Sequence, residues 1–591
     1  MMTLLPSRAA SLAALSFFTA SLSLQAEVKL PAIFGDHMVL QEGVKLPVWG
    51  TASPGEDVSV TVGKDTAKTK AGEDGKWKVE LSALPKGSAP TTMTVAGTNT
   101  VTFNDVLVGD VWICSGQSNM EFNLGGGNFG FGGASNAAEA LKAANDPGLR
   151  FFIVTKKVSN EPLADVVQPG EPKNEAQKAV AAVTGKWVVC TPETIGYFSA
   201  VGYFFGKDLR AQYKRPIGLI GTYWGGTPAE AWTSIEKLRS DAALKIYADH
   251  YDKIRAEMAT KEKEFPAQIE AFKAVMEKWK TEVQEPYNAA LEEWNKAAQQ
   301  AKEQGKPAPE KPVMAKQKPR PPVEPDGGAH GPANLFNGMV APIIPYAIKG
   351  AIWYQGESNA GQPTEYASLF PDMITDWRAR WNQGDFPFFF VQLASFKSSN
   401  VQNWPFLREA QLKTLSLPNT GMAVAADVGD VVDIHPKDKQ DVGSRLALAA
   451  RKVAYGDKKV VYSGPSYEKM TVKDGKVHLT FGNKGGGLII GSAPWVTLGA
   501  KPLPTTSLLG FTVAGDDMKF VPADAKIVGD EVVVSAAGVA KPTAVRYGWA
   551  NIFEGNLYNT EGLPASPFRT DTGAYDPVAA GASPTPVPVA K

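Results

Sequence analysis

The pattern of hydrophobic and polar positions changes several times along the chain. Near the N-terminus, runs such as 58–62 and 76–81 alternate apolar and polar side chains between Gly, Pro and Asp turns. This alternation predicts a small β-sandwich. From about residue 106 the apolar runs become continuous and alternate with helix-like stretches such as 200–213 and 370–381. Such a pattern is typical of a parallel sheet with helices on its faces, so we expect an α/β domain there.

The expected strands of the α/β domain end in polar, glycine-containing loops. An apolar run at 106–108 is interrupted by Gly109-Asp110, and the chain resumes with a buried strand that leads into a Ser/Gly turn. We interpret four runs as buried strands: 111–114, 216–221, 348–354 and 386–392.

Residues from about 233 to 325 depart from this pattern. They are rich in Lys, Glu and Ala, and 256–285 and 286–304 have helical composition with spaced apolar residues. Pro266 is expected to kink or restart the first helix. We interpret the segment as a solvated helical hairpin inserted in the α/β domain, with a lid or partner surface as the alternative.

β-like patterns return near the C-terminus, at 476–481 and 531–535, before a Pro/Ala-rich tail that we expect to be disordered. The predicted organisation comprises a signal peptide, an N-terminal β domain, the first part of the core, the insertion, the second part of the core, a C-terminal β domain and the tail. The boundaries of these parts are 1–26, 27–105, 106–232, 233–325, 326–458, 459–575 and 576–591.

The N-terminal segment has the pattern of an export signal. Arg8 precedes an apolar stretch at 9–24, and Leu24-Gln-Ala26 is an acceptable cleavage site. We therefore expect export to the periplasm or the outside, with no membrane attachment after cleavage. In an oxidising compartment Cys114 and Cys190 either form a disulfide or remain buried thiols, and sequence leaves both open.

Composition excludes several classes of function. Lys+Arg and Asp+Glu both number 61, so no bulk charge attracts nucleic acid. Two cysteines exclude a Cys-rich metal site, and no metal or other cofactor is expected. Any imidazole base must come from five histidines: His37, His250, His330, His435 and His478.

Three polar segments carry candidate chemistry. Ser115-Gly-Gln-Ser-Asn-Met120 directly follows a predicted strand, at the sheet edge where open α/β folds place their sites. Gln355-Gly-Glu-Ser-Asn359 follows another strand and supplies two amides and a carboxylate. Asp430-Val-Val-Asp-Ile-His-Pro436 places an imidazole beside two acids. By elimination His435 is the best general base, with His330 in a Gly-rich loop as second choice.

These residues match a known family. The chain resembles the sialate O-acetylesterase group of SGNH hydrolases, which are esterases with a flavodoxin-like α/β fold. The resemblance runs through most of 27–575, excluding much of the charged insertion. Its blocks are 112–120, 221–232, 332–339, 355–359, 433–440 and 562–571. The fold that this resemblance implies is a flavodoxin-like SGNH core, here with β-sandwich or jelly-roll-like segments at both ends.

The resemblance implies roles for individual residues. Ser118 would be the nucleophile and His435 its general base. The oxyanion would be held by the Ser118 N–H, by Gly225 or Gly226, and by the amide of Gln355 or Asn359.

The acid that orients His435 is left open by the sequence. The general SGNH pattern places it three residues before the histidine, where this chain has Val432. Asp433 is the first candidate, Glu357 the second and Asp430 the third, and a Ser–His pair oriented by a backbone carbonyl is the alternative.

The expected function is an exported carbohydrate O-acetylesterase that acts through an acetyl-serine intermediate. Its substrate would be an acetylated carbohydrate, either sialic acid or a plant polysaccharide such as xylan or xyloglucan. Trp224 and Tyr354 are candidate sugar-binding rings. Two alternatives are a non-catalytic carbohydrate-binding protein with a decayed esterase core, and a lipase or thioesterase of the same fold. Sequence does not reveal the oligomeric state.

Overall fold

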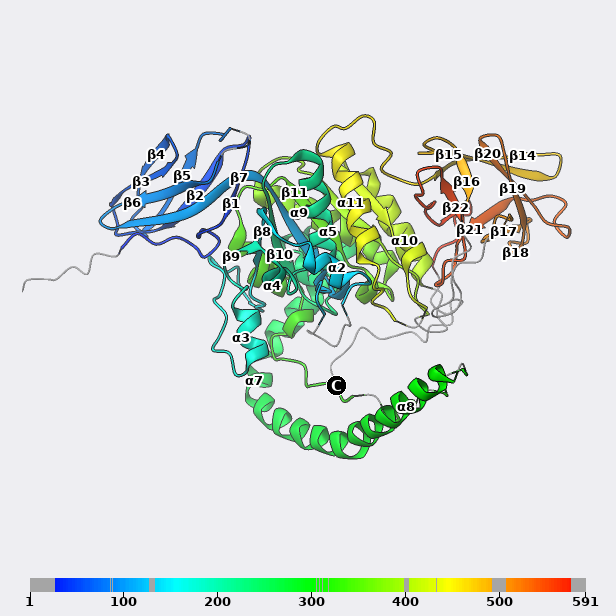
Figure 1. The fold of residues 1–591 in the computed structure, drawn as a ribbon, viewed down its shortest axis with the longest axis horizontal. Coiled ribbons are helices and arrows are strands. Elements are labelled where there is room, and N and C mark those ends of the chain that lie inside the picture. The colour runs from blue at the N-terminus through cyan, green and yellow to red at the C-terminus, as the bar shows by residue number, and fades with distance from the viewer. Residues whose placement is uncertain are drawn as a thin grey trace, which may run out of the picture.

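The computed structural model describes residues 27–575 except 86, 88, 127–132, 305, 308, 311, 317, 398–402, 432 and 492–505. The expected signal peptide and C-terminal tail lie outside the described residues. Two β modules lie at opposite ends of a central α/β core, and a curved helical arm extends from the core (Figure 1). The two β modules therefore do not form one accessory unit. No helix in the described part of the chain is long and apolar enough to span a membrane.

The N-terminal module is a β-sandwich whose last strand continues into the core. β2 pairs with β5, and β3 pairs with β4 and β6. Its burial alternates along the strands, as in Asp57–Val62, because one face of each sheet lies against the other. The strands are β1 Val39–Gln41, β2 Leu46–Thr51, β3 Asp57–Val62, β4 Asp65–Lys70, β5 Lys76–Leu81 and β6 Thr91–Ala96.

β7, Thr100–Gly116, belongs to both the N-terminal module and the core. Its first half pairs with β6, and its second half pairs in parallel with β10 and β11. The break in the apolar run at Gly109-Asp110 does not divide the strand, so the prediction of a separate buried strand at 111–114 is wrong. Asp110 is fully buried within β7 because Gln41 and Tyr455 donate hydrogen bonds to its carboxylate and Arg215 forms an ion pair with it. The predicted boundary at 105/106 therefore falls inside a continuous strand.

The core sheet has the order β13-β12-β11-β7-β10-β8-β9. β9 is antiparallel to β8, and the other neighbours are parallel. The chain order reverses between β7 and β11, which makes this the switch point where loops from both sides meet. The strands after β7 are β8 Asp146–Ile153, β9 Trp187–Cys190, β10 Ile217–Tyr223, β11 Gly350–Tyr354, β12 Phe388–Gln392 and β13 Thr420–Val424.

Helices cover both faces of the core sheet. α5 packs against α11 on one face, where Trp112 of β7 contacts Phe205, and α9 packs against α10 on the other, where Trp353 of β11 contacts Phe370. Strands buried on both faces explain the continuous apolar runs in the sequence. The core helices are α1 Ser118–Glu121, α2 Ala137–Lys142, α3 Glu175–Ala181, α4 Pro192–Ile195, α5 Ala200–Tyr213, α6 Ile235–Ser240, α9 Pro363–Trp381, α10 Trp404–Lys413 and α11 Lys439–Val453.

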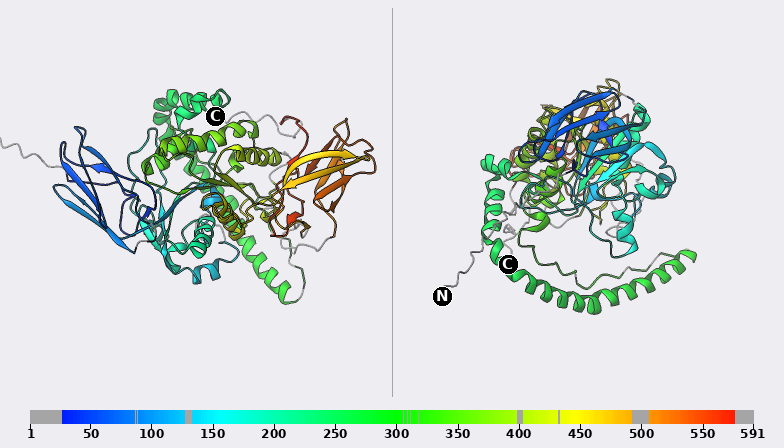
Figure 2. Two further views of the ribbon diagram at one scale, coloured as in Figure 1. Left: turned by 90° about the horizontal axis from the view of Figure 1, so that it is seen from above. Right: turned by 90° about the vertical axis from the view of Figure 1, so that its left-hand side faces the viewer.

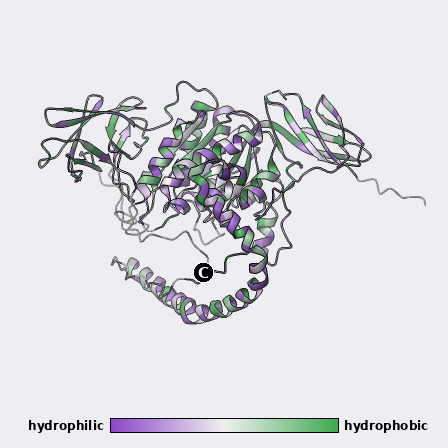
Figure 3. Ribbon diagram, turned by 180° about the vertical axis from the view of Figure 1, so that it is seen from behind, coloured by the Kyte–Doolittle hydropathy of each residue, from purple (hydrophilic) through white to green (hydrophobic). Residues whose placement is uncertain are grey.

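The charged segment forms an arm that projects away from the core (Figure 2). α7, Lys245–Trp279, continues through a π-helical turn at Lys280–Gln284 into α8, Glu285–Glu303. Pro266 lies inside α7 and does not end it, so the alternative that a new helix starts there is wrong. The chain returns along the arm, where the Trp279 indole donates to the Lys316 carbonyl at 3.2 Å. Hydrophilic and hydrophobic residues alternate along the arm (Figure 3).

The C-terminal module contains two four-stranded antiparallel sheets. Arg408 of α10 attaches it to the core by donating to the carbonyls of Ala550 and Asn551, and to those of Leu393 and Ala394. Its strands are β14 Ser466–Lys473, β15 Lys476–Gly482, β16 Leu488–Ile490, β17 Phe511–Ala514, β18 Val521–Pro522, β19 Asp524–Val528, β20 Glu531–Ser535, β21 Ala544–Tyr547, β22 Leu557–Asn559 and β23 Phe568–Arg569.

Candidate active site

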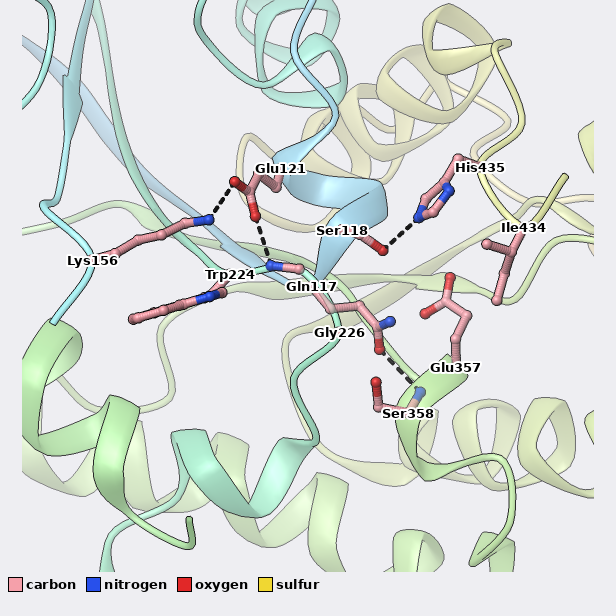
Figure 4. Close-up of a pocket in the computed structure, with 11 residues that line it drawn as sticks. Gln117, Ser118, Glu121, Lys156, Trp224, Gly226, Glu357, Ser358, Ile434 and His435 are labelled. Carbon is pink, nitrogen blue, oxygen red and sulfur yellow. Dashed lines mark hydrogen bonds and ion pairs between the residues drawn. The ribbon is translucent and has the colours of Figure 1, made fainter. Parts of the chain in front are cut away.

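Five segments of the chain form a pocket of about 420 Å³ at the switch point of the core sheet (Figure 4). The first four follow β7, β8, β10 and β11, and the fifth precedes α11. Gly116 makes the first turn possible, since its φ is +136° and a Cβ there would lie 2.2 Å from the Tyr354 carbonyl oxygen. The pocket is lined by Gln117, Ser118, Glu121, Lys156, Trp224, Gly225, Gly226, Glu357, Ser358, Ile434 and His435.

Ser118 and His435 face each other across this pocket. The His435 Nε2 lies 2.8 Å from the Ser118 Oγ, although 317 residues separate them in sequence. Ser118 is the first residue of α1, so its backbone N–H is not used inside the helix. Burial lowers the pKa of His435, and the positive charge of Lys439 lowers it further, while Asp433 opposes both effects. A neutral imidazole can accept the Ser118 proton.

Of the three candidate acids, the structure places Asp433 at the imidazole. Its Oδ1 lies 3.4 Å from the His435 Nδ1 and also accepts the His435 backbone N–H at 2.9 Å. Asp430 accepts the Asp433 backbone N–H at 3.0 Å. About half of the Asp433 side chain is exposed, so solvent screens its charge. The imidazole is thus oriented by an acid only two residues before it in sequence.

Glu357 lies beneath the same pocket in a network that the sequence did not reveal. Its Oε1 accepts a hydrogen bond of 2.6 Å from Asn119, whose amide also donates to the Ile434 carbonyl. The buried Lys439 ammonium donates to the Asn119 Oδ1 at 2.6 Å. The other Glu357 oxygen, Oε2, is buried without a hydrogen-bond partner among the described residues. Asn119 therefore ties the Glu357 loop, α11 and the His435 loop together.

Burial sets the protonation of this network. It raises the pKa of Glu357 and lowers that of Lys439 to about 7. Asn119 directly follows the predicted nucleophile Ser118, and this adjacency is the sequence feature that could have indicated that Asn119 belongs to the site. Lys439 lies in the matched block at 433–440 but has no recognisable pattern of its own.

The four expected oxyanion donors differ in their availability. The Gln355 amide donates to Thr227 and Asn359, and the Asn359 amide donates to Glu230. Neither side chain lines the pocket, so the expectation that one of them donates into it is corrected. Both stabilise the loops behind the pocket instead. Burial raises the pKa of Glu230 to about 7.

Gly225 and Gly226 both line the pocket, but only one has an uncommitted N–H. The Gly225 N–H donates to Glu121 at 2.6 Å, whereas no acceptor among the described residues contacts the Gly226 N–H. The Gly226 carbonyl lies 2.9 Å from the His330 Nε2. His330, the second candidate for the base, thus contacts the glycine loop and does not line the pocket.

Gln117 provides a side-chain amide that the sequence analysis did not single out. Its Oε1 accepts hydrogen bonds from the backbone N–H groups of Gly356 and Ser358, which fixes the orientation of the amide. The Nε2 is therefore on the opposite side, and no acceptor in the described part of the chain contacts it. In Figure 4 this amide lies between Ser118 and Glu357.

The two expected aromatic rings behave differently. Trp224 lines the pocket, with the Lys156 ammonium 5.3 Å from its ring centroid. Lys156 in turn forms an ion pair of 2.5 Å with Glu121. Tyr354 is fully buried in β11 and lies outside the pocket lining, so its expected role in sugar binding is corrected to core packing. Neither Glu121 nor Lys156 was predicted from sequence.

Cys114 and Cys190 are both buried free thiols, so a disulfide between them is wrong. Cys114 lies in β7 and Cys190 in β9, and β10 and β8 separate these strands in the sheet. Three steps of about 4.8 Å exceed the roughly 7 Å between Cα atoms that a disulfide can span. Burial raises the pKa of both thiols, which disfavours the reactive thiolate.

Comparison with known proteins identifies the family of the chain. Residues 333–452, which include Glu357 and His435, match the family model described as carbohydrate esterase, sialic acid-specific acetylesterase. A solved structure of a carbohydrate acetylesterase from Xanthomonas citri is 35% identical, with a TM-score of 0.68, over 92% of this chain and 100% of that one. The chain belongs to the sialic acid-specific acetylesterase family of carbohydrate esterases.

Members of this family from animals are similar over most of their length. The sialate O-acetylesterase of Homo sapiens is 29% identical over 497 residues, which cover 77% of this chain and 76% of that protein. The sialate O-acetylesterase of Rattus norvegicus is 28% identical over 584 residues, covering 90% and 92%. The esterase described here is accordingly a carbohydrate acetylesterase, a carboxylic ester hydrolase.

Proposed function

We propose that the esterase is an exported serine hydrolase with an SGNH-type, flavodoxin-like core, and that it removes acetyl groups from sugar hydroxyls. The observation that carries this proposal is the 2.8 Å approach of the His435 Nε2 to the Ser118 Oγ inside a pocket at the switch point. Numbered along the chain, the parallel strands β8-β10-β7-β11-β12-β13 have the order 2-3-1-4-5-6, and without β8 the remaining five have the flavodoxin-like order 2-1-3-4-5. Export rests on the pattern of residues 1–26.

Acylation begins when Ser118 attacks the acetyl carbonyl carbon. His435 takes the Ser118 proton at Nε2, and Asp433 stabilises the imidazolium through Nδ1. Collapse of the tetrahedral intermediate breaks the bond to the sugar oxygen, which takes the proton from His435. Water then attacks the acetyl-Ser118 ester by the same steps and releases acetate.

Three donors are available for the oxyanion that forms in both steps. They are the Ser118 N–H at the start of α1, the Gly226 N–H and the Gln117 Nε2, whose direction is fixed by its bonds to Gly356 and Ser358. Loss of one such donor typically costs about 2.7–4 kcal/mol of barrier stabilisation. Gln117 takes the role that sequence analysis gave to Gln355 or Asn359.

The proposal is tested by measuring acetate release beside a Ser118→Ala variant. The panel contains 9-O-acetyl sialoside, acetylated xylan, acetylated xyloglucan oligosaccharides and a long-chain acyl ester. We expect acetate from at least one acetylated sugar, no hydrolysis of the long-chain ester, and a loss of more than about 100-fold in the variant without a change in thermal unfolding. A variant that keeps more than about one percent of the activity would remove Ser118 as nucleophile.

A further inference from the structure

The charged groups of the pocket compensate one another. Among the described lining residues, Glu121, Lys156, Glu357 and His435 are titratable. Lys156 is the lysine among them, and no arginine lines the pocket in the described ranges. Lys156 is therefore the one permanent cation among the described lining residues.

Lys156 is already paired with a carboxylate that is held in place. Its Nζ lies 2.5 Å from the Glu121 Oε1, and the Glu121 Oε2 accepts the Gly225 N–H at 2.6 Å. The Glu121 side chain is only 7% exposed, so turning it away would strand a buried carboxylate. A substrate carboxylate that approached Lys156 would thus remain close to the negative charge of Glu121.

Glu357 adds a second acidic group at the other side of Ser118 (Figure 4). In its ionised form it would repel an anionic substrate, and in its neutral form it would offer no attraction. The cation behind it, Lys439, is fully buried and donates to Asn119, so it does not reach the pocket. His435 is neutral when it acts as a base. The described residues that line the pocket therefore present no uncompensated positive charge.

We propose that the pocket selects acetyl esters of uncharged sugars over those of acidic sugars, and that Glu121 determines this selectivity by neutralising Lys156. This inference rests on the proposed esterase function of the same pocket. Trp224 adds apolar surface to the pocket beside the paired Lys156, and aromatic side chains of this kind line sites for uncharged ligands. Burying the carboxylate of an acidic sugar here would cost desolvation without a free partner.

The test compares a neutral and an acidic substrate that both carry a primary acetyl ester. These are methyl 6-O-acetyl-galactoside and 9-O-acetyl-N-acetylneuraminic acid, with 4-nitrophenyl acetate as a small uncharged reference. We expect kcat/KM to be at least about 10-fold higher for the neutral sugar, with most of the difference in KM. Equal values, or a preference for the acidic sugar, would overturn the inference.

A matched pair of variants assigns the selectivity to Glu121. Glu121→Gln keeps an acceptor for the Gly225 N–H but leaves Lys156 without its counter-charge, so kcat/KM for the acidic sugar should rise by about 10-fold relative to the neutral sugar. Lys156→Gln should not produce this rise. If both variants leave the ratio unchanged, Glu121 does not determine selectivity.

Two further measurements separate a failure of the esterase function from a failure of the proposed selectivity. Turnover of 4-nitrophenyl acetate by the wild-type protein, lost in Ser118→Ala, tests the catalytic function separately from sugar selectivity. If that activity is absent, the proposed function fails first. If Glu121→Gln does not fold, the salt dependence of the wild-type protein decides: a KM for the acidic sugar that rises strongly with salt would show an attraction by Lys156 and would contradict the inference.

Discussion

His435 accepts the Ser118 proton only when its ring is neutral, so the pH dependence of kcat/KM reports its pKa. Burial lowers this pKa below the usual 6.5. Because the neutral form predominates above the pKa, we expect kcat/KM to rise with pH and to reach its plateau with a midpoint below 6.5. A midpoint above 6.5 would contradict the burial of the imidazole in this pocket.

The same pH profile separates the two candidate acids. Asp433 raises the pKa of His435, so Asp433→Asn should move the midpoint to lower pH and reduce the rate by less than the about 10⁴-fold seen for a buried triad acid, since Asp433 is half exposed. Glu357→Gln should leave the midpoint nearly unchanged, because Glu357 binds Asn119. The opposite pattern would make Glu357 the partner of the imidazole.

Two substitutions at Gln117 distinguish donation from anchoring. Gln117→Glu keeps an oxygen for the N–H groups of Gly356 and Ser358 but removes the donor, so kcat should fall about 10²–10³-fold with little change in KM. Gln117→Met removes both functions and should also lower the thermal stability. If Gln117→Glu retains most of the activity and Gln117→Met does not, Gln117 acts only as an anchor.

At the residue scale, the sequence predicted functional residues that belong to short motifs, and it missed contacts between residues that are far apart in the sequence. Ser118 and His435 follow expected strands or loops and could be named without a structure. The pairing of Glu121 with Lys156 joins α1 to the segment after β8, and no spacing in the sequence indicates it. Gln355 and Asn359 were expected at the pocket, but the direction of their side chains depends on packing against Thr227 and Glu230.

Among the elements, the helical arm contacts the site region through its base, as far as the described residues of the arm show. Arg255 of α7 donates to Asn334, which lies in the matched block at 332–339, and Ile254 is buried near Gly327. Beyond Trp279 the arm contacts its own returning chain. The distal half is therefore not needed to hold the pocket residues.

Shortening the arm tests this division. Replacing residues 281–314 by a short Gly/Ser linker should leave hydrolysis of a small acetyl ester within about twofold of the wild-type rate, since Trp279 and Lys316 already bring the two limbs together. The control is Arg255→Ala at the base, which should lower the rate through the loop of Asn334. A large loss on shortening would show that the distal arm acts at the pocket.

Composition correctly predicted that the arm is helical. It did not predict that α7 would run on without an end at its internal proline. α7 extends through Pro266, where a kink or a new helix start was expected, and the structure contradicts the new start. The bounds of strands in the β modules were predicted more accurately: the expected strands 76–81 and 531–535 coincide with β5 and β20. In those strands alternating burial leaves a period-two pattern in the sequence, which long solvated helices lack.

For the whole molecule, Arg408 is a fully buried polar connection between the core and the C-terminal module. Its guanidinium is fully buried and donates to four backbone carbonyls, two on each side. Burial lowers its pKa to about 9, so it remains charged at neutral pH. The four buried carbonyl oxygens that accept its hydrogen bonds stabilise the positive charge of the guanidinium.

Arg408→Met should reduce the free energy of unfolding by at least about 3 kcal/mol, because each buried carbonyl left without a donor costs about 1–3 kcal/mol. Chemical denaturation measures the change, and the exposed Arg239→Met is the control, with an expected effect within about 0.5 kcal/mol. A loss of similar size in both variants would indicate that the interface does not depend on Arg408.

β7 spans residues 100–116 without a break and ends two residues before Ser118. The N-terminal sandwich is consequently an extension of the strand that delivers the nucleophile, and not a unit on a flexible tether. A polysaccharide chain that contacted both the N-terminal sandwich and Ser118 would therefore meet two points at a fixed separation, because β7 joins them without a break. If a flexible linker is inserted after Gly109, hydrolysis of small esters should remain intact only when both halves of β7 keep their pairing with the neighbouring strands.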